Sequence, residues 1–238
     1  MKIFDKNFKL FLTVVFLSAV LLTLNAAAQK RKPVVSKKAQ IAGLKTLGFK
    51  QFQNKQLDTA IETFTKCIAL NPILNDADEC YLGRGTAYFL LKKYEEAIPD
   101  FGKAYSSFMD FNAMYLRGRA YFELNKFEEA NKDFNLVVMI VEPEKIKKSY
   151  PEIYGYRGAT YIAADKLDQG IADYTKAIEL KPQSAEFYYA RGLAYDMKDD
   201  FPNAEKDLRE TLRLDPSMKS AVEEVLKRIE IKKNTAGK

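Results

Sequence analysis

The sequence lacks the residue on which much protein catalysis depends. Its 238 residues contain no histidine, so neither a serine–histidine or cysteine–histidine nucleophile pair nor a histidine metal site can be built. Paired carboxylates occur at Glu95-Glu96 and Glu128-Glu129, but they stand beside predicted helix turns, where solvated charge is ordinary. These residue types predict a protein that is not an enzyme, uses no cofactor and binds no metal.

Arginine and aspartate recur at a fixed spacing that could form ion pairs. At four places an aspartate follows an arginine after sixteen residues. The four combinations are Arg84 with Asp100, Arg117 with Asp133, Arg157 with Asp173, and Arg191 with Asp207. A partly buried arginine favours a local carboxylate partner, whereas an exposed one could bind a ligand. The choice depends on the elements that carry these residues.

A short phrase recurs around each of these arginines. Tyr-Leu-Gly-Arg-Gly-Thr-Ala-Tyr at 81–88 returns in related form at 115–121, 154–161 and 188–195, with a degenerate copy at 44–51. Each copy contains a glycine that is followed, twelve residues later, by a second small residue. A bulky residue follows four positions after that small residue. The small residues are Ala60, Ala97, Ala130, Gly170 and Ala204, and the bulky ones are Phe64, Phe101, Phe134, Tyr174 and Leu208. Three units end in a proline, at Pro72, Pro182 and Pro216.

This ladder of small and aromatic residues resembles the tetratricopeptide repeat family, whose unit is a helix–turn–helix of about 34 residues. The resemblance implies an all-α solenoid of stacked antiparallel helix hairpins, here in an exported protein of bacterial type. The predicted units are 41–74, 78–111, 111–144, 151–184 and 185–218, followed by a capping helix at 219–232 and a disordered tail at 233–238. The small residues would stand where the two helices of a unit approach most closely.

In such a hairpin the repeat positions of the arginine and the aspartate lie close together. We therefore predict structural ion pairs between the two helices of a unit, or across to its neighbour, with ligand binding as the alternative. Unit one has Leu47 and Thr63 at these positions, so it lacks both charges. Loss of one aspartate is expected to cost about 1–3 kcal/mol.

The two cysteines, Cys67 and Cys80, stand on surfaces of units one and two that pack together in a stacked array. Two cysteines in an exported chain are a disulfide candidate, and this bridge would contribute about 3 kcal/mol in the loop-entropy model. The alternative is that Cys67 is simply a small core residue. The sequence leaves both interpretations open.

The first 28 residues have the pattern of a secretory signal peptide. Three lysines precede an apolar run at 10–24, and small residues up to Ala28 suit cleavage at that point. The expected location is periplasmic or secreted, with an uncleaved N-terminal membrane anchor as the alternative. Residues 29–40 are predicted to form a basic, flexible linker. Membrane contact would come only through an uncleaved signal or this linker.

The net charge of +6 is concentrated in this leader. Residues 1–28 carry +2 and residues 29–38 carry +5, so the remainder is close to neutral at −1. A basic surface for nucleic acid is therefore not predicted.

By the resemblance, the first helix of each unit lines a concave groove that holds a partner. The residues predicted to line it are Lys45, Phe49, Phe52, Leu82, Phe89, Tyr115, Arg119, Phe122, Tyr189, Leu193 and Met197. Exposed apolar and aromatic side chains usually mark interaction sites, although some of these aromatics could instead be core between helices. The lysine–asparagine clamp of chaperone-binding members is missing, because Phe49 and Thr86 occupy its asparagine positions.

These features predict a non-catalytic scaffold or adaptor of the cell envelope that binds a protein or peptide partner in an apolar, aromatic groove. Two alternatives stay open: a helical-repeat protein that binds a glycan or small molecule, and a non-catalytic subunit of an envelope enzyme complex. A closed polar pocket ringed by tyrosines would favour the glycan binder. Neither the partner's identity nor the oligomeric state follows from the sequence.

Overall fold

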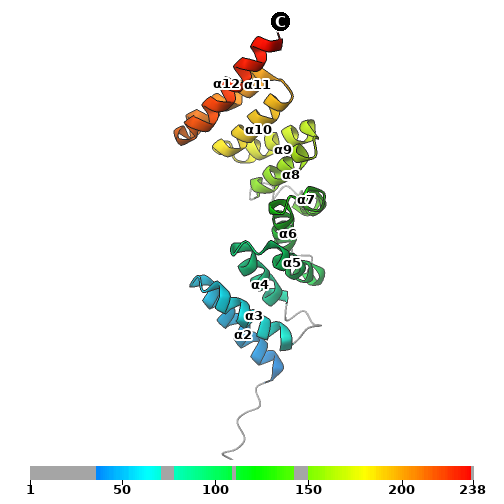
Figure 1. Ribbon diagram of the computed structural model, residues 1–238. Helices are drawn as coiled ribbons and strands as arrows, with labels where there is room; N and C mark the ends of the chain where they lie inside the picture. Colours follow the sequence, from blue (N-terminus) through cyan, green and yellow to red (C-terminus); the bar gives the residue numbers. More distant parts are fainter. Residues whose placement is uncertain (1–35, 71–77, 109–110, 142–149, 237–238) are drawn as a thin grey trace, which may run out of the picture.

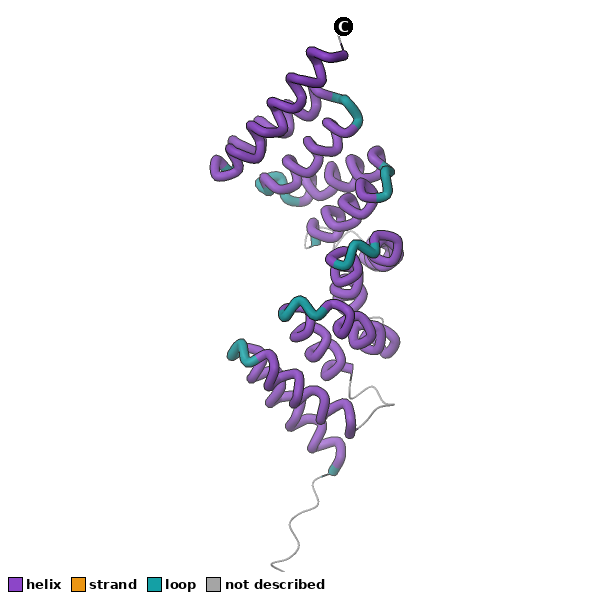
Figure 2. Tube along the Cα trace, viewed as in Figure 1, coloured by secondary structure: helices purple, strands orange, loops and turns teal. Residues whose placement is uncertain are grey.

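The computed structural model describes residues 36–70, 78–108, 111–141 and 150–236. Within these ranges the chain consists of helices joined by short turns, without a strand (Figure 2). The helices are α2 (Lys37–Gln53), α3 (Leu57–Leu70), α4 (Asp78–Leu90), α5 (Tyr94–Phe108), α6 (Phe111–Glu123), α7 (Phe127–Val141), α8 (Pro151–Ala163), α9 (Leu167–Leu180), α10 (Ala185–Met197), α11 (Phe201–Leu214), the short 3-10 helix η3 (Pro216–Met218) and α12 (Lys219–Ala236). They form an elongated stack of hairpins with α2 near one end and α12 at the other (Figure 1). The predicted signal peptide lies outside the described residues.

The stacking brings the first helices of the hairpins together on one face. Each helix packs against the next along the chain, and further contacts join α2 to α4, α4 to α6, α6 to α8, and α8 to α10. The second helices approach one another less closely. The face formed by α2, α4, α6, α8 and α10, called here the A-helix face, is therefore the inner side of the array.

Phe64 shows why glycine recurs in the repeat. Its ring is fully buried where α2, α3 and α4 meet. A Cβ atom at Gly48, and likewise one at Gly83, would lie 2.5 Å from this ring. At Gly43, which shares α2 with Gly48, a Cβ atom would meet no described residue within 4 Å. Close packing therefore requires the missing side chain at the first two glycines but not at Gly43.

The turns inside the five units share one backbone geometry. Each contains a single non-glycine residue with φ between 57° and 60°, namely Lys55, Lys92, Asn125, Asp165 and Asp199. In the first turn the Lys55 N–H donates to the Phe52 carbonyl at 2.9 Å, and the Gln56 N–H donates to the Gln51 carbonyl at 3.0 Å. This Schellman pattern satisfies carbonyls at the end of the first helix. The array thus keeps its turn geometry while the turn sequence varies.

Both ends of the array are more helical than predicted. α2 begins at Lys37, inside the predicted linker 29–40, because the Ser36 side chain accepts a hydrogen bond from the Ala39 N–H at 3.2 Å and caps the helix. α12 continues to Ala236, inside the predicted disordered tail 233–238. Its last turns are held by Lys232, whose Nζ donates to the buried Asp196 carboxylate at 3.0 Å. The linker and tail predictions were wrong at these residues.

α12 covers the C-terminal end of the stack. Its apolar residues Val222, Val225 and Ile229 are buried in one cluster with Ala204 and Leu208 of α11. No helix among the described residues is long and apolar enough to cross a membrane.

Candidate interaction groove

Arginine–aspartate pairs join the first and second helices of units two to five. In each, Nε and one terminal nitrogen of the arginine donate to the two carboxylate oxygens at 2.6–2.9 Å. The aspartate side chains are only 4–8% exposed, and the arginine side chains 16–22%. Bidentate pairs of this kind are both strong and geometrically specific. These arginines are therefore bonded inside the array rather than free in the groove.

In three of these four arginines a third nitrogen reaches the preceding unit. The acceptors are Thr65 Oγ1 for Arg84 (3.0 Å), Asn135 Oδ1 for Arg157 (3.1 Å) and Thr175 Oγ1 for Arg191 (2.9 Å). All three acceptors stand two residues after the aspartate position of that preceding unit. Each of these arginines thus links two hairpins as well as the two helices of its own hairpin.

Burial and pairing act in opposite directions on Asp100. Burial raises the pKa of its carboxyl, and the hydrogen bond from Arg84 offsets only part of that rise. The same hydrogen bond raises the pKa of the Arg84 guanidinium. Because such a pair costs desolvation free energy, its main effect is to penalise any packing that leaves one charge unpaired.

A disulfide joins Cys67 of α3 to Cys80 of α4, with the two Cα atoms 6.4 Å apart. Both residues are fully buried. Unit one has no arginine–aspartate pair, because Leu47 and Thr63 occupy those positions. The covalent bond therefore anchors a unit that has no pair of its own.

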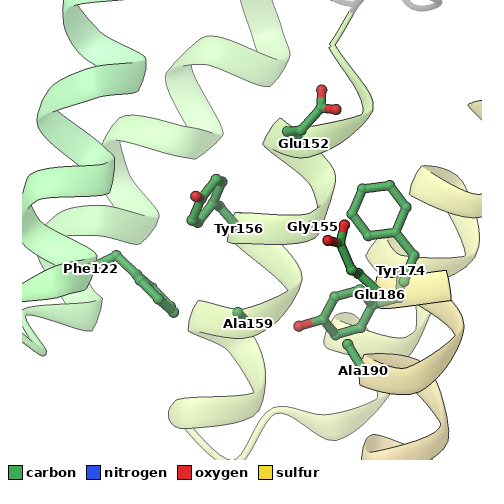
Figure 3. Close-up of a pocket in the computed structure, with 9 residues that line it drawn as sticks. Phe122, Glu152, Gly155, Tyr156, Ala159, Tyr174, Glu186 and Ala190 are labelled. Carbon is green, nitrogen blue, oxygen red and sulfur yellow. The ribbon is translucent and has the colours of Figure 1, made fainter. Parts of the chain in front are cut away.

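Two largely apolar cavities lie on the A-helix face, on either side of α6. The N-terminal pocket, of about 340 Å³, is lined by Phe49, Phe52, Leu82, Gly83, Thr86, Asn112 and Leu116. The C-terminal pocket, of about 360 Å³, is lined by Phe122, Glu152, Gly155, Tyr156, Ala159, Tyr174, Glu186, Phe187 and Ala190. Figure 3 shows Phe122 and Tyr156 on one side of the C-terminal pocket and Glu186 and Ala190 on the other. The inner face thus offers two separate places for apolar side chains.

Arg119 stands on α6 between the two pockets. Leu116 lines the N-terminal pocket and Phe122 the C-terminal one, and each is three residues from Arg119, so all three share one side of the helix. The guanidinium carbon lies 4.9 Å from the Phe89 ring centroid and 5.0 Å from that of Tyr156. Its Nε atom is buried and donates to no acceptor in the part of the chain that the structure describes.

The rings beside Arg119 form a packed cluster around Tyr156. Tyr156 contacts Tyr115, Phe122 and Phe134, with centroid distances of 5.7–6.0 Å. Burial raises the pKa of Tyr115 to about 12, while the nearby Arg119 cation opposes the rise. Tyr115 is partly buried against the core cluster that contains Met114 and Tyr154, and it lines neither pocket.

Three predicted groove residues belong to the packed interior or its edge. Phe89 is buried in one cluster with Phe101 and packs edge-on against Tyr94 at 5.3 Å, so its predicted place in an open groove was wrong. The ring turns between α4 and α5, where it gains apolar neighbours. Tyr189 and Leu193 are half-buried against the cluster that α12 covers.

Two more predicted groove residues lie outside both pockets. Lys45 donates to Glu79 at 2.8 Å and so joins α2 to α4. Met197 is 51% exposed in the last turn of α10. Five of the predicted residues remain around the pockets or between them: Phe49, Phe52, Leu82, Arg119 and Phe122.

The prediction missed Tyr156, which lies at the centre of the site. Its repeat position holds Gly83, Leu116 and Ala190 in the neighbouring units, so the repeat itself did not single it out. An aromatic residue where other units carry small or aliphatic ones was the available signal.

A more polar cavity, of about 510 Å³, opens between α7 and α8. One tyrosine, Tyr161, is among the residues that line it. The Asn131 amide there already donates to Thr160 Oγ1 at 3.0 Å. This is not the tyrosine-ringed pocket expected of a glycan binder. Across the described ranges, no group of three or more acidic or cysteine side chains is placed to hold a metal ion.

Comparison with known families identifies the class of protein that this architecture defines. A family model described as tetratricopeptide repeat matches residues 51–73, 78–107, 111–140 and 185–218, and a second, described as TPR repeat, matches 158–199. Together they cover more than half of the chain. The protein belongs to the tetratricopeptide repeat family.

Curated relatives match this chain through parts of their own length. The chain is 36% identical to the chloroplastic tetratricopeptide repeat domain-containing protein PYG7 of Arabidopsis thaliana over 70 residues. This alignment covers 29% of this chain and 23% of that protein. The chain is 35% identical to RNA polymerase II-associated protein 3 of Rattus norvegicus over 156 residues. This alignment covers 64% of this chain and 16% of that protein. The chain thus spans less than a quarter of either relative.

Solved structures share the fold over most of the chain. MamA from Desulfovibrio magneticus RS-1 superposes with a TM-score of 0.67 at 18% identity, covering 75% of this chain and 96% of that one. YrrB, described as a TPR protein with an unusual peptide-binding site, superposes with a TM-score of 0.64 at 20% identity, covering 81% of this chain and 92% of that one. At these identities the likeness establishes the solenoid fold.

Proposed function

We propose that this protein is a non-catalytic scaffold of the cell envelope, exported by its N-terminal segment, that holds an extended segment of a partner protein on its A-helix face. The observation that carries this proposal is the presence of two apolar pockets on that face, on opposite sides of α6. The repeat family and the described peptide-binding site of YrrB support a protein partner.

The pockets suit side chains of an extended chain. Each is at the small end of the range for ligand sites and is lined mainly by aromatic and aliphatic groups. In an extended peptide, alternate side chains point to the same side, so one segment can fill both pockets while its other side chains face solvent.

Site-specific photocrosslinking in the native cells tests this proposal. A crosslinking amino acid at Phe122, in the C-terminal pocket, should capture a partner protein. The same group at Leu136, which is 42% exposed on the second helix of unit three, should capture much less and serves as the control. Ala190→Glu places a charge in the C-terminal pocket and should abolish capture at Phe122.

Three results would contradict the proposal. Equal capture at both positions, or capture that survives Ala190→Glu in a protein with an unchanged circular dichroism spectrum, would exclude the A-helix face as the binding surface. Recovery of the protein only from cytosol after cell fractionation would exclude the envelope location.

A further inference from the structure

We infer that the groove selects partner segments in which an aspartate or glutamate side chain stands between apolar residues, and that Arg119 binds this carboxylate. The inference rests on the proposed function and adds the chemistry of the partner. It is argued from the charge state of the groove, from the packing of Arg119 and from the position of Arg119 between the two pockets.

Arg119 differs from the other arginines of the described ranges in its partners. Seven of these arginines are each bonded to a carboxylate within the protein: Arg84, Arg117, Arg157, Arg191, Arg209, Arg213 and Arg228. No carboxylate in the described part of the chain lies within ion-pair distance of Arg119, and its buried Nε donates to no acceptor. Its charge is therefore available for an anion from outside.

Aromatic rings surround the Arg119 cation, and the Tyr115 hydroxyl shares a side-chain hydrogen bond with it, but its buried Nε has no acceptor among the described residues. The guanidinium carbon lies 4.9, 5.0 and 5.7 Å from the ring centroids of Phe89, Tyr156 and Tyr115. Ring faces stabilise a cation, but they do not replace the oxygen acceptors that its planar N–H groups prefer. Because Arg119 is partly buried among these rings, a carboxylate that pairs with it forms a stronger hydrogen bond than on an open surface.

The acidic residues of the groove restrict where a partner's carboxylate can bind. Glu152 and Glu186 line the C-terminal pocket, and Glu152 accepts a hydrogen bond from Lys181 Nζ at 3.1 Å. A carboxylate of the partner inside that pocket would be repelled by Glu186, whereas an apolar side chain of the partner would not. A phosphate, with its higher charge, would be repelled more strongly. The charge pattern therefore fits a single carboxylate above Arg119.

The position of Arg119 favours a side chain over a chain terminus as the source of this carboxylate. Leu116 and Phe122, one helical turn to either side of Arg119, open into different pockets. A segment that fills both pockets must run past Arg119, so the carboxylate meeting it lies inside the segment.

Selection from a library of random peptides displayed on phage tests the inference. The selected peptides would be synthesised with amidated C-termini, each in an acidic form and in a form with glutamine or asparagine replacing the acid. We expect the neutral form to bind the unmodified protein about tenfold more weakly, the usual order for loss of a charge-assisted hydrogen bond. For Arg119→Gln the two forms should bind within about twofold of each other.

Two further variants separate binding from stability and from general charge. Arg119→Met keeps an apolar stem between the rings and should also lose the preference for the acidic peptide. This variant therefore tests the inference even if Arg119→Gln folds poorly. Lys206→Gln removes one positive charge at an exposed site on α11 and should keep the full tenfold preference.

The outcomes distinguish this inference from the proposed function. Failure to select any peptide, or selected peptides that still bind Ala190→Glu, would overturn the proposed function. Peptides that are lost from Ala190→Glu, yet bind equally in acidic and neutral forms, would overturn the role of Arg119 and leave groove binding intact. Acid preference that survives both Arg119 variants, or that requires a free C-terminus, would overturn the inference as well.

Discussion

At the scale of the residue, Asp173 shows how much one carboxylate organises. It accepts from Arg157 Nε at 2.7 Å and from a terminal Arg157 nitrogen at 2.6 Å, joining α8 to α9. Arg157 also donates to Asn135 of the preceding unit at 3.1 Å. Without the carboxylate, two N–H groups of a largely buried guanidinium would lose their acceptors.

We predict that Asp173→Asn lowers the free energy of unfolding by about 1–3 kcal/mol, because it removes the charge that compensates Arg157 in a desolvated site. Asp168→Asn is the matched control, since Asp168 lies on the same helix and its ion pair with Lys198 is exposed. The control should change stability little. Urea unfolding followed by circular dichroism measures both, and equal effects of the two substitutions would contradict a structural role for the buried pair.

At the scale of the element, α2 carries two glycines in opposite surroundings. Gly48 faces the Phe64 ring, where a Cβ atom would lie 2.5 Å away, whereas Gly43 faces open space. Within a helix, glycine is less favourable than alanine by about 1 kcal/mol. At Gly48 that cost is offset by close packing, and at Gly43 nothing in the structure offsets it.

Alanine substitution at the two positions should therefore shift stability in opposite directions. Gly43→Ala is expected to raise the free energy of unfolding by about 0.5–1 kcal/mol. Gly48→Ala is expected to lower it by about 1–3 kcal/mol, because α2 and α3 must separate or the buried Phe64 ring must move. Thermal unfolding of both variants checks the prediction, and a stabilising Gly48→Ala would show that the helices can separate freely.

At the scale of the whole molecule, the array is held by links between neighbouring units, and these links are unevenly distributed. Units two to five each have a buried arginine–aspartate pair, whereas unit one depends on the disulfide at Cys67 and Cys80 and on packing around Phe64. In a stacked repeat protein each unit is stabilised mainly by its neighbours, so a weak terminal unit can open alone.

Removing the disulfide should therefore loosen one end of the array. In the Cys67→Ser, Cys80→Ser double variant, we expect the amides of α2 and α3 to exchange hydrogen faster, while those of α8 to α11 are unchanged. The bridge is expected to contribute about 3 kcal/mol in the loop-entropy model. Hydrogen exchange with mass spectrometry measures the effect by segment. Unchanged protection of α2 and α3, or a uniform loss over the whole array, would contradict the prediction.

The sequence predicted the fold and the pairing of Arg84, Arg117, Arg157 and Arg191 with their aspartates because both follow from local spacing. A spacing of sixteen residues across a helical hairpin brings the same two positions together wherever it recurs. The groove was predicted less well. Phe89 and Tyr115 stand on first helices as expected, but one is buried in the core and the other is half-buried. Which way such a ring turns depends on the neighbouring unit, and no repeat position records that packing.

The sequence by itself determined the repeats, their turns and the positions of the paired charges, since these depend on residues close together in one hairpin. Only the tertiary structure decided that Tyr156 and Phe122 meet across two units and that α12 covers Tyr189 and Leu193. It also decided that Arg119 lies among aromatic rings, with no carboxylate partner in the described ranges. These contacts join residues from different units or helices. They are fixed by how each hairpin is oriented on the next, a packing property that local spacing does not specify.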